Sequence, residues 1–278
     1  MRRGPRGGPG EFGLRLARAE HLLGQDARSA RDPLSVLAAV LRHQRDRAGS
    51  APVAVRGSAT DCFPLLDAKS AAPSIVQELG PAVAALRGAV PPPLAAAAVH
   101  LQALTRSESA ALVETWLDDG SLVEPRLGFW VQVAAGPVLE AGARDVALPE
   151  DWHGAACPVC GGPPQASAIA EESGEFMAGS PRSLICGRCA TWWPFPRITC
   201  AHCGDEDPRR IESFLAEGRG WARVDTCANC QGYIKSFDLR EPGAVGVVPL
   251  VDDVATLTLD VWAREQGFSR PALSLAGV

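Results

Sequence analysis

The sequence lacks the features of a membrane protein and of a basic nucleic-acid-binding protein. None of its apolar runs approaches the ~20 residues that a membrane-spanning helix requires. The formal net charge of −5 at pH 7 opposes non-specific binding to nucleic acid, which needs a basic surface. Arg2 and Arg3 are followed by Gly, Pro and Glu instead of an apolar core, so we read no export signal there. We therefore expect no membrane insertion and no nucleic-acid partner.

Several short motifs that mark catalytic or nucleotide-binding sites are also missing. The chain has no P-loop, no G-x-S-x-G nucleophile elbow and no H-E-x-x-H pair. We therefore assign no catalytic residue and no cofactor-binding residue, and we expect a protein that is not an enzyme. A hydrophobic content of 46% and a charged content of 21% are typical of a folded protein.

Residues 14 to about 150 show the apolar periodicity of helices. One stripe follows the i, i+3, i+4, i+7 pattern with Leu34, Leu37, Ala38 and Leu41. Asp32 is the predicted N-cap of this helix, and Pro33 suits its first turn. Such stripes normally face a core, so we interpret them as a helix bundle and not as a groove for a partner.

Three further helices are predicted downstream. One opens at Pro93, the next is capped by Ser107, and the third covers an apolar stripe over residues 127–138. Pro137 lies inside the third stripe and should kink or end that helix.

Beyond His153 the pattern changes to short strands and turns. Strands are predicted at 183–185, 211–214, 221–224 and 233–237. A hairpin turn is predicted at 217–220, between two of these strands. A final amphipathic helix is expected from about Asp252 to Gln266, with Asp252 or Asp253 as its cap and Gly267 at its end.

The cysteines are the most informative residues. Eight of the nine form four C-x-x-C pairs: Cys157/Cys160, Cys186/Cys189, Cys200/Cys203 and Cys227/Cys230. The pairs are separated by 25, 10 and 23 residues, which reads as two copies of one unit, C-x-x-C, hairpin, C-x-x-C. Two thiolates three residues apart on a tight turn can both reach one ion at ~2.3 Å, and two such turns complete a tetrahedron.

We therefore predict two metal sites with four cysteine ligands each, in preference to disulfides or a thioredoxin-like dithiol. The repeat favours sequential pairing of the C-x-x-C pairs, with a cross-braced arrangement as the alternative. A tetrahedral four-sulfur site suits iron or zinc. Gly161, Gly204 and, one position further on, Gly232 follow the second cysteine of three pairs, where a turn can demand positive φ.

Other residues near these pairs receive no role. His153 and His202 are interpreted as surface imidazoles, because each site already has four sulfurs. Cys62 is treated as a small apolar residue in a loop over 49–64. An acidic run, Glu171, Glu172 and Glu175, is interpreted as a solvated turn.

At the cysteine pairs the sequence resembles the FdhE family of formate dehydrogenase accessory (formation) proteins. The resemblance is carried by CPVCGGPP (157–164), LICGRCATWWPFPRITCAHCG (184–204), TCANCQGYIKSFD (226–238) and VDDVATLTLDVWAREQGFSR (251–270). It implies an α+β chain in which a helical N-terminal domain precedes two rubredoxin-like or zinc-ribbon-like metal domains and a C-terminal helix. It also implies iron at the cysteine sites, one ion in each, with zinc as the alternative.

On this basis the expected organisation is a disordered tail over 1–13, a helical domain over 14–150, metal domains over 151–195 and 196–245, and a C-terminal helix and tail over 246–278. The resemblance implies an accessory protein for assembly or maturation of a respiratory formate dehydrogenase. Such a protein would bind the catalytic subunit of that enzyme in the cytoplasm before export. The alternatives are a rubredoxin-like electron-transfer component and a zinc-ribbon nucleic-acid-binding protein. Residues 151–240 carry nine Lys/Arg and eleven Asp/Glu, which disfavours the last.

Overall fold

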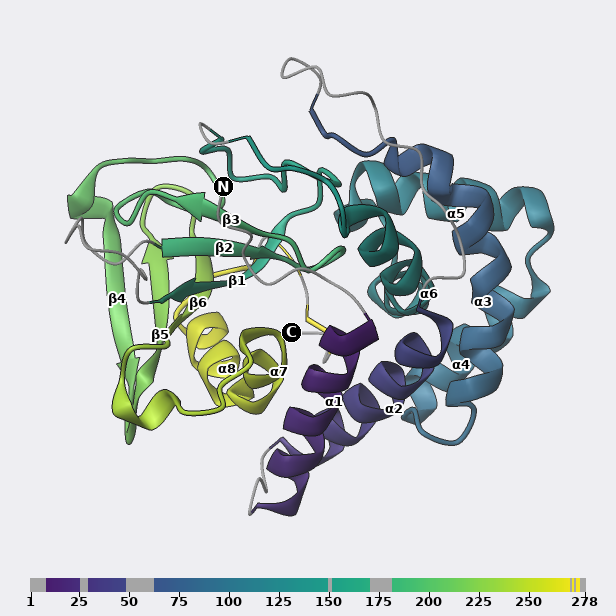
Figure 1. Ribbon diagram of the computed structural model, residues 1–278, viewed down its shortest axis with the longest axis horizontal. Coiled ribbons are helices and arrows are strands. Elements are labelled where there is room, and N and C mark those ends of the chain that lie inside the picture. The colour runs from purple at the N-terminus through teal and green to yellow at the C-terminus, as the bar shows by residue number, and fades with distance from the viewer. Residues whose placement is uncertain are drawn as a thin grey trace.

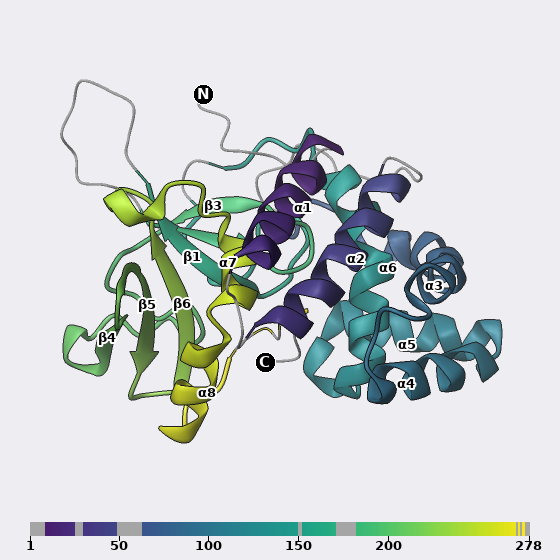
Figure 2. The same cartoon turned by 90° about the horizontal axis from the view of Figure 1, so that it is seen from below.

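A computed structural model describes residues 9–25, 30–48, 63–149, 152–170, 182–270, 272 and 274–275. Its helices lie mainly on one side and its strands on the other, with the C-terminal helices α7 and α8 against the sheet (Figure 1). Turning the molecule shows α1 and α2 between α7 and the remaining helices (Figure 2). Over the described residues, no helix is both long enough and apolar enough to cross a membrane.

Six α-helices make up the N-terminal half. They are α1 (Pro9–Gly24), α2 (Arg31–Arg47), α3 (Ala72–Leu86), α4 (Pro92–Ala103), α5 (Arg106–Asp118) and α6 (Pro125–Ala143). Short 3-10 helices occupy Ala68–Ala71, Gly120–Leu122, Pro208–Arg210 and Pro242–Ala244. The helical stripes predicted from the sequence are confirmed, and α3 is a helix that the sequence analysis did not assign.

Several predicted helix boundaries were wrong. Ala30 is the N-cap of α2, and Asp32 lies inside the first turn. Thr105, and not Ser107, caps α5, because its hydroxyl and the Glu108 carboxylate satisfy each other's backbone N–H groups in a capping box. Helix α6 continues through Pro137 to Ala143.

The start of α1 corrects the predicted N-terminal tail. Residues 9–13 are helical, whereas residues 1–8 lie outside the described part of the chain. Phe12 is buried in a core with residues of α2 and α7, and the Arg15 guanidinium lies 4.4 Å from its ring centroid. Arg15 also pairs with the buried Glu140 of α6, which ties α1 to the bundle.

A single six-stranded sheet forms the other half. Its strands are β1 (Pro164–Ile169), β2 (Arg182–Cys186), β3 (Trp192–Phe195), β4 (Ile211–Ala216), β5 (Arg219–Cys227) and β6 (Gly232–Asp238). They lie in the order β3-β2-β1-β6-β5-β4. All neighbours are antiparallel except β1 and β6, which pair in parallel with Ala166 opposite Lys235. This central pair joins the two cysteine-bearing units into one sheet.

The four predicted strands are confirmed as β2, β4, β5 and β6, with Gly218 at positive φ in the β4–β5 turn. Strands β1 and β3 were not predicted from the sequence. Strand β1 (PQASAI) is buried along its whole length, but it contains one β-branched residue, Ile169, and no aromatic residue, so its composition does not mark it as a strand. Strand β3 contains Pro194, which is tolerated because β3 is an edge strand.

The predicted final helix is interrupted at Thr256, which separates α7 (Pro249–Ala255) from α8 (Leu257–Glu265). The expectation that Asp252 or Asp253 caps this helix was wrong, because Val248 is the N-cap of α7. Both carboxylates are instead buried in ion pairs, Asp252 with Arg18 of α1 and Asp253 with Lys235 of β6. These pairs hold the C-terminal helices in place.

The largest core extends across both halves. It contains side chains of α3 to α6, including Trp130 and Leu139, together with Cys157 and Cys186 of the first cysteine group and Trp193 of β3. The fold class predicted from the sequence is confirmed: N-terminal helices precede a β region with two four-cysteine clusters and terminal helices. The structure adds that the first cluster and the helix bundle share one core.

Candidate metal centres

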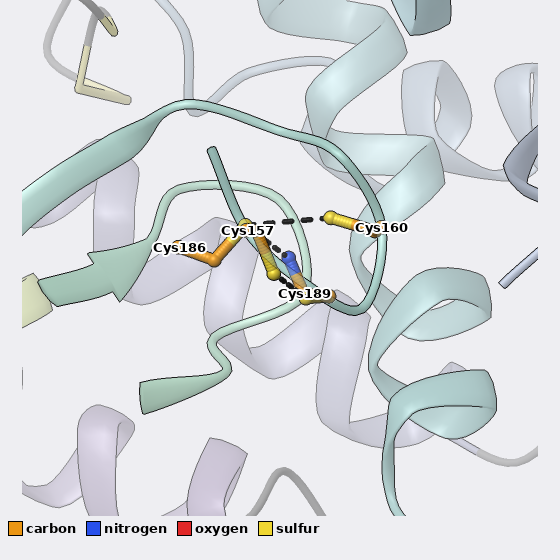
Figure 3. Close-up of side chains that lie close together, drawn as sticks. All are labelled: Cys157, Cys160, Cys186 and Cys189. Carbon is orange, nitrogen blue, oxygen red and sulfur yellow. Dashed lines mark hydrogen bonds between the residues drawn. The ribbon is translucent and has the colours of Figure 1, made fainter. Parts of the chain in front are cut away.

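The first cluster, called site 1, consists of Cys157, Cys160, Cys186 and Cys189. Their sulfurs point toward one another from two facing turns (Figure 3), and all four cysteines are buried. The Sγ atoms of Cys157 and Cys189 are 3.6 Å apart, and those of Cys160 and Cys186 are 3.4 Å apart. Among the six pairs of sulfurs none exceeds 4.8 Å.

The second cluster, called site 2, consists of Cys200, Cys203, Cys227 and Cys230. The Sγ atoms of Cys200 and Cys230 are 3.7 Å apart, and those of Cys203 and Cys227 are 3.8 Å apart. Cys203 is exposed and Cys230 is partly exposed, whereas Cys200 and Cys227 are buried. Site 2 therefore has the same ligand set as site 1 but lies at the surface.

Both clusters have the dimensions of a tetrahedral thiolate site. Four sulfurs at ~2.3 Å from a central ion lie about 3.8 Å from one another. The closest sulfur contacts, 3.4–3.8 Å, match this spacing and are far longer than the ~2.05 Å of a disulfide bond. Each cluster could therefore hold one metal ion, and the donor set suits iron or zinc.

In two of the four C-x-x-C turns, backbone N–H groups point at the first sulfur. Cys186 Sγ accepts hydrogen bonds from the N–H groups of Arg188 and Cys189, at 3.3 and 3.5 Å. Cys200 Sγ accepts from His202 and Cys203 in the same way, at 3.4 and 3.5 Å. N–H donors of this kind stabilise thiolates and tune a bound metal.

The residue after each second cysteine has positive φ, whatever its type. Gly161 and Gly204 fulfil the prediction, with φ of 74° and 75°. At the other two pairs Ala190 and Gln231 take this conformation, with φ of 55° and 54°. Gly232 does not, and its lack of a side chain serves another purpose, because a Cβ there would lie 2.7 Å from the His202 ring. The turn geometry thus imposes the backbone conformation even where the sequence lacks glycine.

The pKa values of the site 1 thiols are shifted in opposite directions. Burial raises the pKa of the Cys157 and Cys189 thiols. Hydrogen bonds from Cys157, Cys186 and Cys189 hold the pKa of Cys160 well below its usual range. A bound cation would favour the ionised form of all four buried sulfurs.

The thiols of site 2 behave differently because the site is more open. Burial raises the pKa of Cys203, but the Asp205 backbone N–H and the side chains of Cys230, Cys200 and Asn229 outweigh it and lower the value to about 7. Burial raises the pKa of Cys200, its neighbour in the site. Cys203 thus combines an exposed sulfur with a lowered pKa.

The eight cysteines predicted as ligands come together in two groups of four, and the arrangement is sequential and not cross-braced. His153 is exposed, and His202 is exposed with its Nδ1 3.9 Å from Cys230 Sγ. Cys62 and the acidic run Glu171, Glu172 and Glu175 lie outside the described residues. Arg209, Arg210 and Arg223 each form an ion pair with a nearby aspartate, which reduces the positive charge that phosphate would meet.

Two arginines that sequence reasoning did not single out hold the cysteine turns in place. Arg188, inside the Cys186–Cys189 turn, donates to the carbonyls of Trp116 and Leu117 at the end of α5 and lies over the Trp116 ring, 4.3 Å from its centroid. Arg182 of β2 donates to the carbonyl of Thr199, at 3.0 Å. Their positions in the sequence were the available signal. Arg188 lies inside a C-x-x-C turn, and Arg182 lies four residues before Cys186.

Comparisons with known proteins agree on one family. Residues 198–276, which include site 2 and the C-terminal helices, match the family model of the FdhE C-terminal domain. A protein named FdhE homolog from Aquifex aeolicus is 34% identical over 179 residues, 64% of this chain and 61% of that protein. One from Pseudomonas aeruginosa is 35% identical over 158 residues, 55% of this chain and 49% of that protein. The aligned part of the chain thus spans about half to three-fifths of the length of these relatives.

The fold has a counterpart among solved structures. The crystal structure of the FdhE protein from Pseudomonas aeruginosa matches 98% of this chain and 97% of its own chain, with a TM-score of 0.67 and 24% sequence identity. At this identity the match establishes the fold alone. The resemblance to the FdhE family is therefore confirmed: residues 198–276 carry the FdhE C-terminal domain, and the chain shares the fold of an FdhE protein.

Proposed function

We propose that this protein is an accessory protein for the assembly or maturation of a respiratory formate dehydrogenase, and is not itself an enzyme. It would bind the catalytic subunit of that enzyme in the cytoplasm, before export. The observation that carries the proposal is the match of residues 198–276 to the FdhE C-terminal domain, supported by relatives named FdhE homolog at 34–35% identity.

We further propose that each four-cysteine cluster holds one iron ion, with zinc as the alternative. The sulfur spacing fits a tetrahedral ion, and the four ligands leave no open coordination position for a substrate. Formate oxidation needs a two-electron acceptor at the reacting carbon, such as a nicotinamide or a molybdenum or tungsten centre. A saturated tetrathiolate ion does not supply one, which agrees with a role in assembly.

The test is copurification combined with genetics. The tagged protein should retain the catalytic subunit of a formate dehydrogenase and should show no formate oxidation by itself. A strain without the protein should still make the dehydrogenase polypeptide but should oxidise little formate by the respiratory route. Normal formate oxidation in a deletion strain with no second copy would contradict the proposal.

A matched pair of variants connects the cysteine sites to this function. Complementation with the Cys227→Ala/Cys230→Ala variant should fail, because it removes two ligands of site 2. The Arg209→Met variant should complement normally, because the Arg209 side chain is 87% exposed and pairs only with Asp207. Equal complementation by both variants would separate the accessory role from the metal sites.

The exposure of Cys203 favours a second candidate, a rubredoxin-like electron-transfer component. A ligand sulfur at the surface gives an electron a short path between the ion and a partner. This candidate predicts that the iron-loaded protein exchanges electrons with a redox partner many times per molecule. An accessory role requires only binding.

A further inference from the structure

Strand β2 and the turn after it carry two buried arginines, one near each cysteine site. The side chain of Arg182, at the start of β2, is 3% exposed. Arg188 is 8% exposed and lies between Cys186 and Cys189 of site 1. A buried guanidinium is costly unless opposite charge compensates it, so the partners of both arginines matter.

Arg182 lies next to site 2. Its guanidinium donates to the carbonyl oxygen of Thr199, the residue before Cys200, and it lines the same cavity as Cys200 and Cys227. Its carboxylate partner is Asp225 of β5, at a distance of 3.6 Å.

Asp225 is shared between two arginines. Arg223 also pairs with it, at 2.9 Å, and the hydroxyls of Ser213 and Ser236 donate to its oxygens. Two guanidinium groups and one carboxylate leave one positive charge in excess beside Cys200 and Cys227. The buried group formed by Lys235, Arg270, Asp253 and Asp260, on the other face of the sheet, has equal numbers of positive and negative charges.

Arg188 has a similar excess at site 1. Its guanidinium is satisfied by the carbonyl oxygens of Trp116 and Leu117 and by the Trp116 ring, all of which are uncharged. Within the described residues, no carboxylate lies within 4 Å of it. The nearby Glu140 is already paired with Arg15. Among the described residues Arg188 thus has no carboxylate in ion-pair contact, and the exposed Asp119 interacts with it electrostatically at longer range.

We propose that Arg182 and Arg188 are the counter-charges of the metal-loaded cysteine sites, Arg182 for site 2 and Arg188 for site 1. Four thiolates around a divalent ion carry a net charge of −2, and around a trivalent ion −1. A fixed buried cation stabilises the more negative state in each case. The inference rests on the proposed function, in which both clusters hold metal.

Two effects follow from a cation at this position. It strengthens metal binding, because the cysteine thiols must lose their protons to bind an ion, and a nearby cation stabilises the resulting thiolates. With iron it also raises the reduction potential, because the ferrous site is one unit more negative than the ferric site.

The experiment measures zinc affinity by competition with a chelator, in reduced protein. The constant of site 2 is assigned with Cys230→Ser, which removes a ligand from that site only. Arg182→Met should weaken zinc binding at site 2 about tenfold and leave site 1 unchanged, since a unit charge nearby at an effective dielectric of ~20 is worth at least that factor. Arg188→Met should weaken zinc binding at site 1 about tenfold and leave site 2 unchanged. If the sites hold iron, a tenfold shift of the ferric/ferrous equilibrium corresponds to ~59 mV for a one-electron couple. The reduction potential of site 2 should be lower by about this amount in Arg182→Met.

Three further variants separate charge from structure. Arg182→Lys keeps the charge and should retain most of the affinity of site 2, whereas the exposed Arg209→Met should change nothing. Asp225→Asn removes the shared carboxylate, so it should tighten zinc at site 2. This opposite sign is informative even if Arg182→Met does not fold.

The outcomes are distinct. Unchanged zinc constants in a folded Arg182→Met variant, or weaker binding in Asp225→Asn as well, would overturn the counter-charge role and leave Arg182 as a structural residue. Failure of the wild-type protein to bind zinc or iron at either cluster would instead overturn the proposed metal function.

Discussion

The two cysteine sites have the same ligands and the same turns but occupy opposite environments. In site 1 every cysteine is buried, and Cys157, Cys160, Cys186 and Cys189 belong to the core that also contains α3 to α6. In site 2 Cys203 is exposed and Cys230 is partly exposed. The difference arises from what covers each turn. Arg188 and Gly187 of site 1 contact α5 and α6, through the carbonyl of Leu117 and the amide of Gln132.

This comparison indicates a division of roles between identical ligand sets. Site 1 connects the helix bundle to the sheet, so its ion would stabilise both halves. Site 2 is held from one side by Arg182 and by the C-terminal segment, where Ser269 exchanges backbone hydrogen bonds with Gln231 and Tyr233. Its open side would leave a bound ion accessible to chelators, oxidants and partners.

The largest difference is expected in stability. Cys186→Ser should lose the ion of site 1 and destabilise the whole chain by several kcal/mol, because a structural ion contributes ~10 kcal/mol or more to folding in small zinc domains. Cys203→Ser should lower the free energy of unfolding much less, because Cys203 is exposed in the native state. Thermal melting followed by far-UV circular dichroism measures both. Equal loss of helical signal in the two variants would contradict the division of roles.

The next difference concerns metal exchange. A chromogenic chelator added to the zinc-loaded protein should remove one ion quickly and the other more slowly, by a factor of about ten or more, since only one ligand set is accessible. Cys203→Ser should abolish the fast phase and spare the slow one. A single phase that accounts for two ions would show that exposure does not control release.

A third difference concerns thiol ionisation after the metal has been removed from site 2. Because the pKa of Cys203 is lowered to about 7, its thiolate is present above that pH and is lost as the pH falls through it. Alkylation of Cys203 by iodoacetamide should therefore reach half its maximal rate near pH 7. Peptide mapping by mass spectrometry identifies the modified cysteine. A midpoint near pH 9 for Cys203 would contradict the hydrogen-bonding pattern described here.

The smallest effects are expected in the turns. Gly204→Ala should destabilise the protein by about 1 kcal/mol, because a side chain at φ 75° is strained even though nothing lies within 4 Å of the new Cβ. Gln231→Gly should act in the opposite direction, by up to about 1 kcal/mol, because it relieves the same strain. Denaturant unfolding of the metal-loaded protein measures both. Effects of the same sign would show that the turn strain is not the cause.

The parts of the structure that depend on local geometry could be predicted from the sequence. The repeated spacing of the C-x-x-C pairs favoured the sequential grouping that the structure shows, although it left a cross-braced grouping open. The capping box of α5 was also visible in the sequence as Thr105 followed three residues later by Glu108, although Ser107 was chosen instead.

The parts that depend on distant partners could not be predicted. The parallel pairing of β1 with β6 joins residues about 70 positions apart, and no local pattern records it. The same holds for Lys235, which is fully buried because Asp253 and Asp260 of the C-terminal helices surround it. The burial of site 1 likewise depends on α5, whose last residue, Asp118, lies 39 positions before Cys157.

The most direct test of the account is the metal content of the protein purified without oxygen. Elemental analysis should find two metal ions per chain, and an isolated ferric site, if iron is bound, should give a visible absorption that bleaches on reduction. Cys230→Ser should retain one ion, because it removes a ligand from site 2 alone. One ion or none in the wild-type protein would contradict the claim that each four-cysteine cluster is a metal centre.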